Sequence, residues 1–284
     1  MYTQHPKWPQ NIQCAAMITV NLDAEYFWLQ LDERAAHMPK TLSMGQYGMT
    51  RGLGRLLDIL QSFSIKATFF VPGIVAEKYA GYMKDIVSAG HEIACHGYLH
   101  ENLSLFDRAQ QQERLKKAVA AIEKYSGVSP RGFRAPEGDL TLETLQIAHS
   151  LGMCYSSDLS DDDRPYFMPI DDAGTQMLQI PIQWANFDFP YLAFNYRPAF
   201  PTGQGRVAPY SSMLSNWKDE FTGHYTHHLC YVMQLDPQTI GNPGRSAILE
   251  EFLTFVKDKP GVWFATGSEM YDYCHQNESE ILHR

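Results

Sequence analysis

Three histidines, a cysteine and two glutamates are concentrated in the stretch HEIACHGYLHENL, and side chains of these types can bind metal. The zincin protease motif is the first test, because it needs two histidines four residues apart on a helix with a glutamate after the first. His91 and Glu92 provide the start of that motif, but Cys95 stands where the second histidine should be. His96 follows His91 by five residues, which separates them by about 140° on a helix. The zincin motif is therefore absent.

His96 and His100 are the histidine pair with the better spacing for metal binding. They lie four residues apart, and on one helical turn both imidazoles would point to the same side. With the carboxylate of Asp23 they would form three protein ligands, as in catalytic zinc sites that keep the remaining position for water. We expect one divalent metal ion, Zn²⁺ first, with Co²⁺ or Mn²⁺ as alternatives. The simpler alternative is that one histidine only caps a helix or forms a hydrogen bond in the core.

Further polar residues follow the predicted strands at their carboxyl ends, where the working residues of (β/α) barrels lie. The set comprises carboxylates, two histidines, an asparagine and an arginine: Asn21, Asp23, Glu25, His96, His100, Arg134, Glu137, Asp139, Asp158 and Asp236. Carboxylates, histidines and an arginine on one rim are the composition of a metal-assisted hydrolase.

The elements that must position these residues alternate between apolar strands and amphipathic helices. Strands are predicted at 14–23, 66–73, 91–96, 131–136, 153–159, 177–184, 228–236 and 261–267. Helices are predicted at 48–65, 74–90, 107–127, 141–152, 246–259 and 268–276. This alternation predicts an α/β fold with parallel strands covered by helices, and the count favours a closed barrel over an open sheet. Asp107 should cap the start of the clearest helix and Gly127 should follow its end.

A single domain over 1–284 is expected, with an aromatic, proline-rich insertion at about 185–226 that we interpret as a lid, a pocket wall or a subunit contact. The acidic segment 158–172 also interrupts the alternation. Within it, the simplest partners for Arg164 are the neighbouring aspartates.

Composition limits the function further. The chain of 284 residues is 44% hydrophobic and 19% charged, with a net charge of −9. This argues against nucleic acid, which would need a concentrated basic surface. Five scattered cysteines without a Cys-x-x-Cys pair are typical of a reducing compartment, and neither a signal peptide nor a membrane-length apolar run is visible. We therefore expect a cytoplasmic protein with a small-molecule substrate and no membrane or nucleic-acid partner.

The segments TVNLDAE, HGYLH, FRAPEG and GVWFAT resemble, in order and spacing, the polysaccharide deacetylase (NodB-homology) family. The resemblance covers roughly residues 12–275 and extends to an intracellular branch that includes cyclic-imide and ureide hydrolases and peptidoglycan-deacetylase-like proteins. It implies a distorted (β/α) barrel, usually of seven strands, and a homo-oligomer, a dimer or a tetramer. It also implies a divalent metal held by Asp23, His96 and His100.

The resemblance assigns roles to other residues as well. Arg134 matches the family arginine that orients a catalytic carboxylate. Trp263 and the FRAP turn, with Pro136 and the following Glu137, would line the substrate pocket. Trp184 opens an aromatic group that continues through Phe187, Phe189, Tyr191 and Phe194, and this group is expected to be pocket wall or interface packing. A carbohydrate-stacking platform is the sharper alternative for the same group.

Two positions depart from the family pattern. Asn21 stands where an aspartate usually acts as general base, and a neutral amide cannot take up a proton at neutral pH. Asp236 stands where a histidine usually acts as general acid. Our hypothesis is that Asp236, or failing that Glu25, takes the proton from the attacking water. Glu25 has an equally weighted structural alternative, an ion pair with an arginine such as Arg51.

The predicted function is metal-dependent hydrolysis of a non-peptide C–N bond in a small cyclic imide, ureide or N-acyl compound. The first alternative is a peptidoglycan or chitooligosaccharide N-deacetylase. The second is a ligand-binding homologue with impaired catalysis, which the residues Asn21 and Asp236 keep open.

Overall fold

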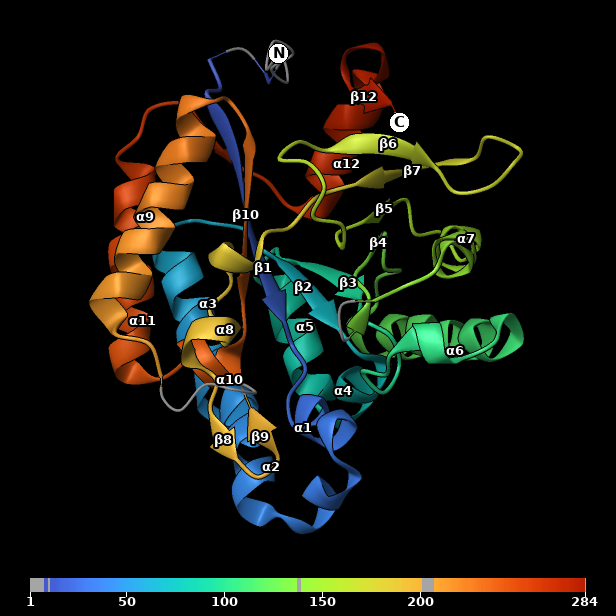
Figure 1. The fold of residues 1–284 in the computed structure, drawn as a ribbon, viewed down its shortest axis with the longest axis vertical. Helices are drawn as coiled ribbons and strands as arrows, with labels where there is room; N and C mark the ends of the chain where they lie inside the picture. Colours follow the sequence, from blue (N-terminus) through green and yellow to red (C-terminus); the bar gives the residue numbers. More distant parts are fainter. Residues whose placement is uncertain (1–7, 10, 137–138, 201–206, 284) are drawn as a thin grey trace.

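The computed structural model describes residues 8–9, 11–136, 139–200 and 207–283. Its main feature is one curled sheet whose central strands are all parallel (Figure 1). The strand order is β10 (Cys230–Leu235), β1 (Cys14–Asn21), β2 (Thr68–Val71), β3 (Glu92–Cys95), β4 (Gly132–Phe133), β5 (Tyr155–Ser156), β7 (Gln176–Gln179), β6 (Tyr166–Pro169) and β12 (Leu282–His283). A further strand, β11 (Val262–Phe264), pairs with the amino-terminal part of β1.

The sheet forms a half-barrel, which confirms the predicted (β/α) barrel class. Each ladder from β10 to β7 is parallel, as the strand–helix alternation predicted, and only β6 runs antiparallel to β7. Among the described strands no ladder joins β12 to β10, so the sheet stays open where the strand count favoured closure.

Helices cover the outer face of this sheet. Figure 1 shows α3, α9 and α11 on one flank and α6 and α7 on the other. The helices that follow or flank the strands are α3 (Leu53–Ser62), α4 (Gly73–Lys78), α5 (Ala80–Ser88), α6 (Arg108–Ser126), α7 (Leu142–Ser150), α9 (Tyr210–Thr226), α11 (Pro243–Lys257) and α12 (Gly267–Gln276). Asp107 caps α6 in a capping box and Gly127 ends it with φ of 80°, as predicted.

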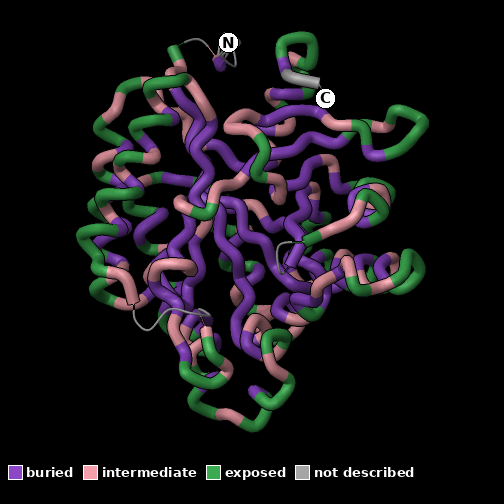
Figure 2. Tube along the Cα trace, in the orientation of Figure 1, coloured by how far each residue is buried: buried purple, intermediate pink, exposed green. Residues whose placement is uncertain are grey.

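Burial follows the layers. Figure 2 shows the central strands buried and the outer helices exposed on one side. All eight residues of β1 are buried, which explains why this strand reads as a continuous apolar run and not as an alternating one. No described helix combines the length and the apolar character that crossing a bilayer would need.

The connection between β1 and α3 holds more structure than the sequence predicted. It contains α1 (Tyr26–Leu31), a 3₁₀ turn (Glu33–His37), α2 (Pro39–Tyr47) and a π-helical turn (Gly48–Gly52) that leads into α3. The π turn lies against the short helix α10 (Pro237–Ile240), where a β-carbon on Gly52 would overlap the carbonyl oxygen of Pro237. The predicted helix over 48–65 therefore begins with an irregular turn because two backbones approach closely there.

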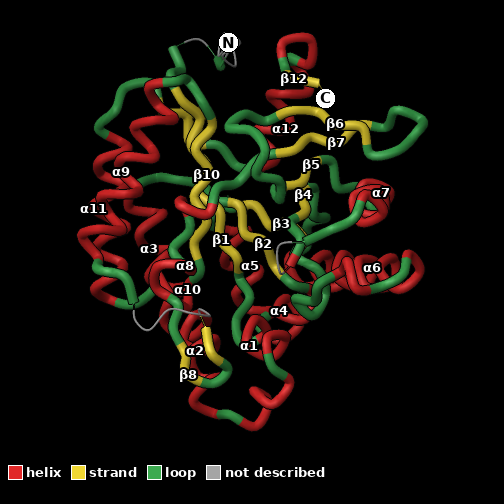
Figure 3. Tube along the Cα trace, in the orientation of Figure 1, coloured by secondary structure: helices red, strands yellow, loops and turns green. Residues whose placement is uncertain are grey.

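The predicted insertion at 185–226 divides into two parts. Its first part contains a 3₁₀ turn (Trp184–Asn186), α8 (Phe189–Leu192) and the hairpin β8–β9 (Asn195–Tyr196 and Ala199–Phe200), which lies against α2 (Figure 3). Its last part, Tyr210–Thr226, is the long helix α9. Trp217 and Phe221 of α9 are fully buried against Phe252 of α11, so this part belongs to the helical layer of the barrel.

Candidate metal centre and catalytic residues

The registers of the parallel strands bring the predicted site to one edge of the sheet. Val20 is level with Leu235, so Asp236 and Asn21 follow on neighbouring strands at the same height. Cys95 is level with Phe133, which places His96 beside Arg134. The carboxyl ends of β1, β3, β4 and β10 therefore supply the site residues together.

Asp23, His96 and His100 form the cluster that the sequence predicted. Nε2 of His96 lies 3.5 Å from Oδ1 of Asp23, and Nε2 of His100 lies 3.3 Å from Oδ2. One donor atom from each residue falls within 4.8 Å of the others, and all three residues are buried. Among the described residues no other group of this kind is found.

The two histidines converge through a tight turn and not through the helical turn that their spacing suggested. Residues 96–100 are non-helical, and the chain reverses through Gly97 at φ 69° and His100 at φ 62°. Such angles are rare for a residue with a side chain, so His100 is held in a strained conformation. A β-carbon on Gly97 would also lie 2.8 Å from Cγ of Pro136, so the FRAP turn packs directly against this turn.

The protonation of His96 suits a metal ligand. Its Nδ1 donates to the carbonyl oxygen of Arg134 at 2.7 Å, which leaves Nε2 with a lone pair that faces Asp23. Burial lowers the pKa of His96 to about 4, so the imidazole is neutral at pH 7. His91, by contrast, accepts a hydrogen bond from the Ala67 backbone at 3.1 Å and lies outside the cluster.

The carboxylate of Asp23 gives a test of whether a cation fits. Burial alone would raise the pKa of Asp23, but His100, His96 and Arg134 outweigh it and keep the group ionised. Its Oδ1 is buried and accepts no hydrogen bond. Leaving a buried charged oxygen without a partner is costly, and a cation at the centre of the cluster would remove that cost. One carboxylate and two imidazoles form a donor set that suits Zn²⁺, Co²⁺ or Mn²⁺.

Arg134 and Asn21 form a fixed pair beside the cluster. Nη1 of Arg134 donates to Oδ1 of Asn21 and to Oγ1 of Thr19, both at 3.0 Å, while Nη2 donates to Oγ of Ser157 at 2.8 Å. Burial lowers the pKa of Arg134 to about 10, so the guanidinium stays charged at pH 7. The amide of Asn21 therefore presents its oxygen to the arginine and its Nδ2 to Nε2 of His96 at 3.4 Å. Asn21 serves here to position its neighbours.

Asp236 follows β10, the neighbour of β1 on the side away from β2, and it caps the start of α10. Its Oδ1 accepts from the backbone of Gln238 at 2.9 Å and its Oδ2 accepts from Nε2 of Gln238 at 3.0 Å. Burial raises its pKa well above the ordinary aspartate range, and the charges of Asp23 and Asp188 raise it further. A carboxyl group with a raised pKa can both accept and donate a proton near neutral pH.

Asp188 is a second buried acid that sequence reasoning missed. Its Oδ1 accepts from the backbone of Asp236 at 3.0 Å, and its Oδ2 accepts from the hydroxyl of Thr239. Burial raises the pKa of Asp188 to about 7. The one available signal in the sequence is a lone acid within the apolar run ANFDFP, which lies in the aromatic insertion.

Glu25 has partners other than the predicted ones. It is buried, and its carboxylate accepts from Nζ of Lys78 and from the hydroxyl of Tyr79 at 2.9 Å. Its partner is therefore a lysine on α4, and not Arg51. This position supports the structural alternative, in which Glu25 ties the start of α1 to α4.

The predicted substrate-binding residues fall in different places. Pro136 is buried against Gly97, next to the cluster. Glu137 lies outside the described residues. Trp184 is 68% exposed and contacts Phe187, so its side chain faces solvent and does not form an enclosed wall.

Trp263 has to be removed from the candidate site. Strand β11 pairs Trp263 with Ala15, near the opposite end of β1 from Asp23. At ~3.3 Å per residue this is roughly 20 Å from the carboxyl edge. There Trp263 packs against Trp8 and Tyr273. The family motif identified the strand correctly, but the short β11 ends before it reaches the rim.

An aromatic group lies beside the cluster, where Phe27 of α1 contacts His100. The ring of Phe27 lies 5.9 Å from that of His100, 4.7 Å from Phe189 and 5.2 Å from Phe200. Phe189 and Phe200 belong to the segment that was expected to act as a lid or pocket wall. We call Phe27, Phe189 and Phe200 the aromatic cover.

Comparison with known proteins identifies the family of the chain. The family model described as Polysaccharide deacetylase matches residues 45–156, which include His96 and His100. A crystal structure of a candidate polysaccharide deacetylase from Mycobacterium smegmatis is 32% identical, covers 99% of this chain and 96% of that one, and superposes with a TM-score of 0.91.

Curated relatives extend over nearly the same length. A peptidoglycan deacetylase of Helicobacter pylori is 27% identical over 89% of this chain and 93% of its own. A peptidoglycan deacetylase-like protein of Gibberella zeae is 29% identical over 89% of this chain and 84% of its own. The chain therefore belongs to the polysaccharide deacetylase family and is a hydrolase of carbon–nitrogen bonds other than peptide bonds.

Proposed function

We propose that the protein hydrolyses the C–N bond of a small amide, cyclic imide or ureide, with a divalent metal ion held by Asp23, His96 and His100. The observation that carries the small-substrate proposal is the aromatic cover beside the cluster. The three ligand residues are at most 4% exposed, and Phe27 separates His100 from the segment that contains Phe189 and Phe200. A buried, aromatic-lined site favours a compact ligand over a polymer chain.

A divalent ion at this position would supply the Lewis-acid chemistry of metal hydrolases, which activates water and polarises the carbonyl group. Asp236 is the residue that we assign to proton transfer. It would take the proton from the attacking water and return it to the leaving nitrogen. The desolvation that raises the pKa of Asp236 makes its carboxylate a stronger base than an exposed aspartate.

Arg134 and Asn21 would hold the ligands in place. The backbone of Arg134 fixes the tautomer of His96, and its guanidinium fixes the amide of Asn21. In this proposal the general base is Asp236, after β10, and not a residue at the position of Asn21 on β1, where the family usually has an aspartate.

A parallel assay tests the substrate class. The purified protein is incubated with succinimide, hydantoin, allantoin and N-acetylglucosamine oligomers, and ring opening and acetate release are both measured. Turnover of the cyclic compounds without acetate release supports the proposal. Acetate release alone would instead support N-deacetylation of glycans. The names of the two relatives, which both contain peptidoglycan, favour this alternative.

The variant Asp236→Asn tests the proton-transfer role. We expect kcat to fall by about 10²–10⁴-fold, the usual contribution of a general acid–base group, while the bound metal is retained. Glu25→Gln is the matched control, because Glu25 is bonded to Lys78 and Tyr79. Full activity in Asp236→Asn together with a large loss in Glu25→Gln would show that the roles are reversed.

A further inference from the structure

A cavity lies beside the candidate catalytic site and is lined in part by Gln238, which is hydrogen-bonded to Asp236. It has a volume of about 420 Å³ and lies between α1, α2, α10 and α11, with residues 192–194 and Val207 completing its wall. This volume is within the range of roughly 300–1,000 Å³ that small-molecule sites occupy. Asp23, His96 and His100 are not among its lining residues.

One side of this cavity carries an arginine with no acidic partner. Nη1 of Arg245 donates to the carbonyl oxygen of Thr239 at 3.0 Å, and its Nε donates to the hydroxyl of Tyr210 at 3.2 Å. Within the described part of the chain Arg245 forms no ion pair with a carboxylate, and no acidic residue lines the cavity. The guanidinium therefore leaves the cavity with an uncompensated positive charge.

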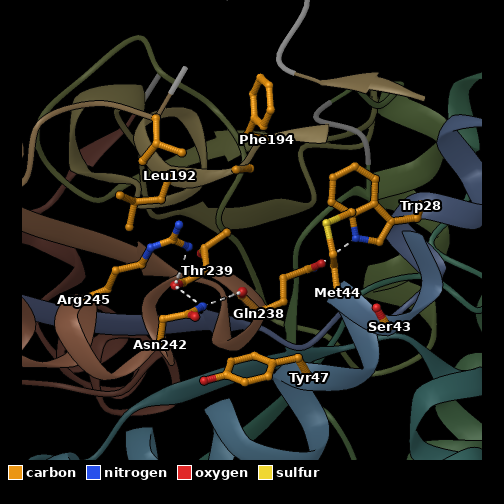
Figure 4. Close-up of a pocket in the computed structure, with 12 residues that line it drawn as sticks. Trp28, Ser43, Met44, Tyr47, Leu192, Phe194, Gln238, Thr239, Asn242 and Arg245 are labelled. Carbon is orange, nitrogen blue, oxygen red and sulfur yellow. Dashed lines mark hydrogen bonds between the residues drawn. The ribbon is translucent and has the colours of Figure 1, made fainter. Parts of the chain in front are cut away.

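The opposite side of the cavity carries two large apolar side chains. Figure 4 shows Arg245, Thr239 and Asn242 on one side and the side chains of Trp28 and Met44 on the other. A flat indole face and a flexible thioether are well suited to an aromatic or branched aliphatic group. The two sides together match a ligand with an anionic head and an apolar body.

We propose that this cavity binds a small organic carboxylate, with the carboxylate on Arg245 and the apolar part against the side that carries Trp28 and Met44. Arginine pairs with carboxylate groups through charge-assisted hydrogen bonds, which are shorter and stronger than neutral ones. Aspartates and glutamates are absent from the lining, so nothing in the cavity repels the anion.

Gln238 connects this cavity to the candidate catalytic site. Its Oε1 accepts from Nε1 of Trp28 at 2.6 Å, and its Nε2 donates to Oδ2 of Asp236 at 3.0 Å. Gln238 itself lines the cavity. A ligand that contacts Trp28 or Gln238 therefore contacts the side chains that hold Asp236 in place.

Calorimetric titration of the full chain with 3-phenylpropionate and 4-phenylbutyrate tests the proposal. The neutral amide 3-phenylpropionamide is the matched ligand control. Charge-assisted hydrogen bonds are stronger than neutral ones, so we expect the amide and the variant Arg245→Gln each to weaken binding by about tenfold or more. Arg34→Gln, which removes a charge from an 81% exposed side chain, should bind as the parent does.

The variant Met44→Trp provides a second test, because it fills the cavity without changing its charge. We expect it to abolish binding while its melting temperature and metal content show an intact fold. A carboxylate that bound instead at the metal cluster would bind equally well to Arg245→Gln and Met44→Trp, and that result would overturn the proposal. Equal affinity for acid and amide, or no saturable binding of either acid to the parent protein, would also overturn it.

Discussion

At the scale of single residues, the unusual feature of this site is the position of Asp236, a buried carboxyl group that does not belong to the metal cluster. The amide of Asn21 accepts a hydrogen bond from Arg134 and is not a proton acceptor, so the proposed function needs a different residue as general base. Asp236 and Asp188 are both buried, and each has a raised pKa because burial penalises its charged form. Two neighbouring buried acids favour a state in which at least one holds a proton near neutral pH.

Asp188→Asn tests this electrostatic account through stability. The pKa of Asp188 is raised from 3.8 to about 7, so the folded state binds the proton more tightly than the unfolded state. The parent should therefore be stabilised at pH values below about 4 and lose that stability as the pH rises to about 7, by at most roughly 1.4 kcal/mol per pH unit. The asparagine does not titrate, so urea unfolding at pH 5, 6, 7 and 8 should show a flatter profile for the variant.

Asparagine is tolerated by the surroundings of Asp188. Its carbonyl oxygen can still accept from the backbone of Asp236, and the hydroxyl of Thr239 can donate to the carbonyl of Asp236 at 2.9 Å. The exposed Asp85 gives the control, since Asp85→Asn should leave the pH profile unchanged. Parallel profiles for the parent and Asp188→Asn would contradict the raised pKa.

The cluster of Asp23, His96 and His100 could be predicted from sequence, and the two buried acids beside it only in part. His96 and His100 have a motif spacing, and Asp23 follows a strand that is visible as an apolar run. Asp236 was found because it follows another such strand. Asp188 accepts a hydrogen bond from the backbone of Asp236, 48 residues later in the chain. A contact between residues so far apart leaves no periodic pattern in the sequence.

At the scale of elements, the position of Asp236 depends on a close backbone contact. Helix α10 begins at Pro237. A β-carbon on Gly52 would overlap the carbonyl oxygen of Pro237. The same contact explains the π-helical turn at the start of α3, which the helical spacing of leucines could not predict. The predicted place of Trp263 in the substrate pocket does not fit the structure, because Trp263 is level with Ala15 near the start of β1. The order of motifs does not reveal how far a short strand extends.

The variant Gly52→Ala tests the contact between Gly52 and Pro237, and Gly54→Ala in α3 is its control. A methyl group at Gly52 must displace α10, so we expect a loss of about 1–3 kcal/mol in unfolding free energy and a lower kcat. A β-carbon added at Gly54 would meet no atom of another segment within 4 Å, so alanine there should stabilise α3 by up to about 1 kcal/mol. Urea unfolding and steady-state kinetics measure both effects. Equal behaviour of the two variants would show that the contact does not position Asp236.

At the scale of the whole molecule, the half-barrel and most of its helices were predictable because alternation is a local pattern. The open side of the sheet and the placement of α9 in the helical layer were not, since both depend on packing between distant segments. The expected homo-oligomer remains a prediction. The aromatic cover is the feature at this scale on which the proposal of a small substrate rests.

Phe200→Ala should widen the site. Phe200 contacts Phe27 and Phe189, each at 5.2 Å, from the β8–β9 hairpin. Removing its ring should raise KM for small cyclic substrates and increase relative activity towards bulkier N-acyl compounds. Tyr196→Ala on the same hairpin is the control, because Tyr196 is 75% exposed. If both variants keep the selectivity of the parent, the cover does not select the substrate.

The most direct test of the account is metal content measured together with hydrolysis in the parent and in Asp23→Asn. We expect the parent to contain about one divalent metal ion per chain and to lose its activity when the ion is chelated. Asp23→Asn should lose both the ion and hydrolysis by at least about 100-fold, since it removes one of three protein ligands. A parent that hydrolyses its substrate at full rate without metal, or an Asp23→Asn variant with unchanged metal content, would contradict the central claim.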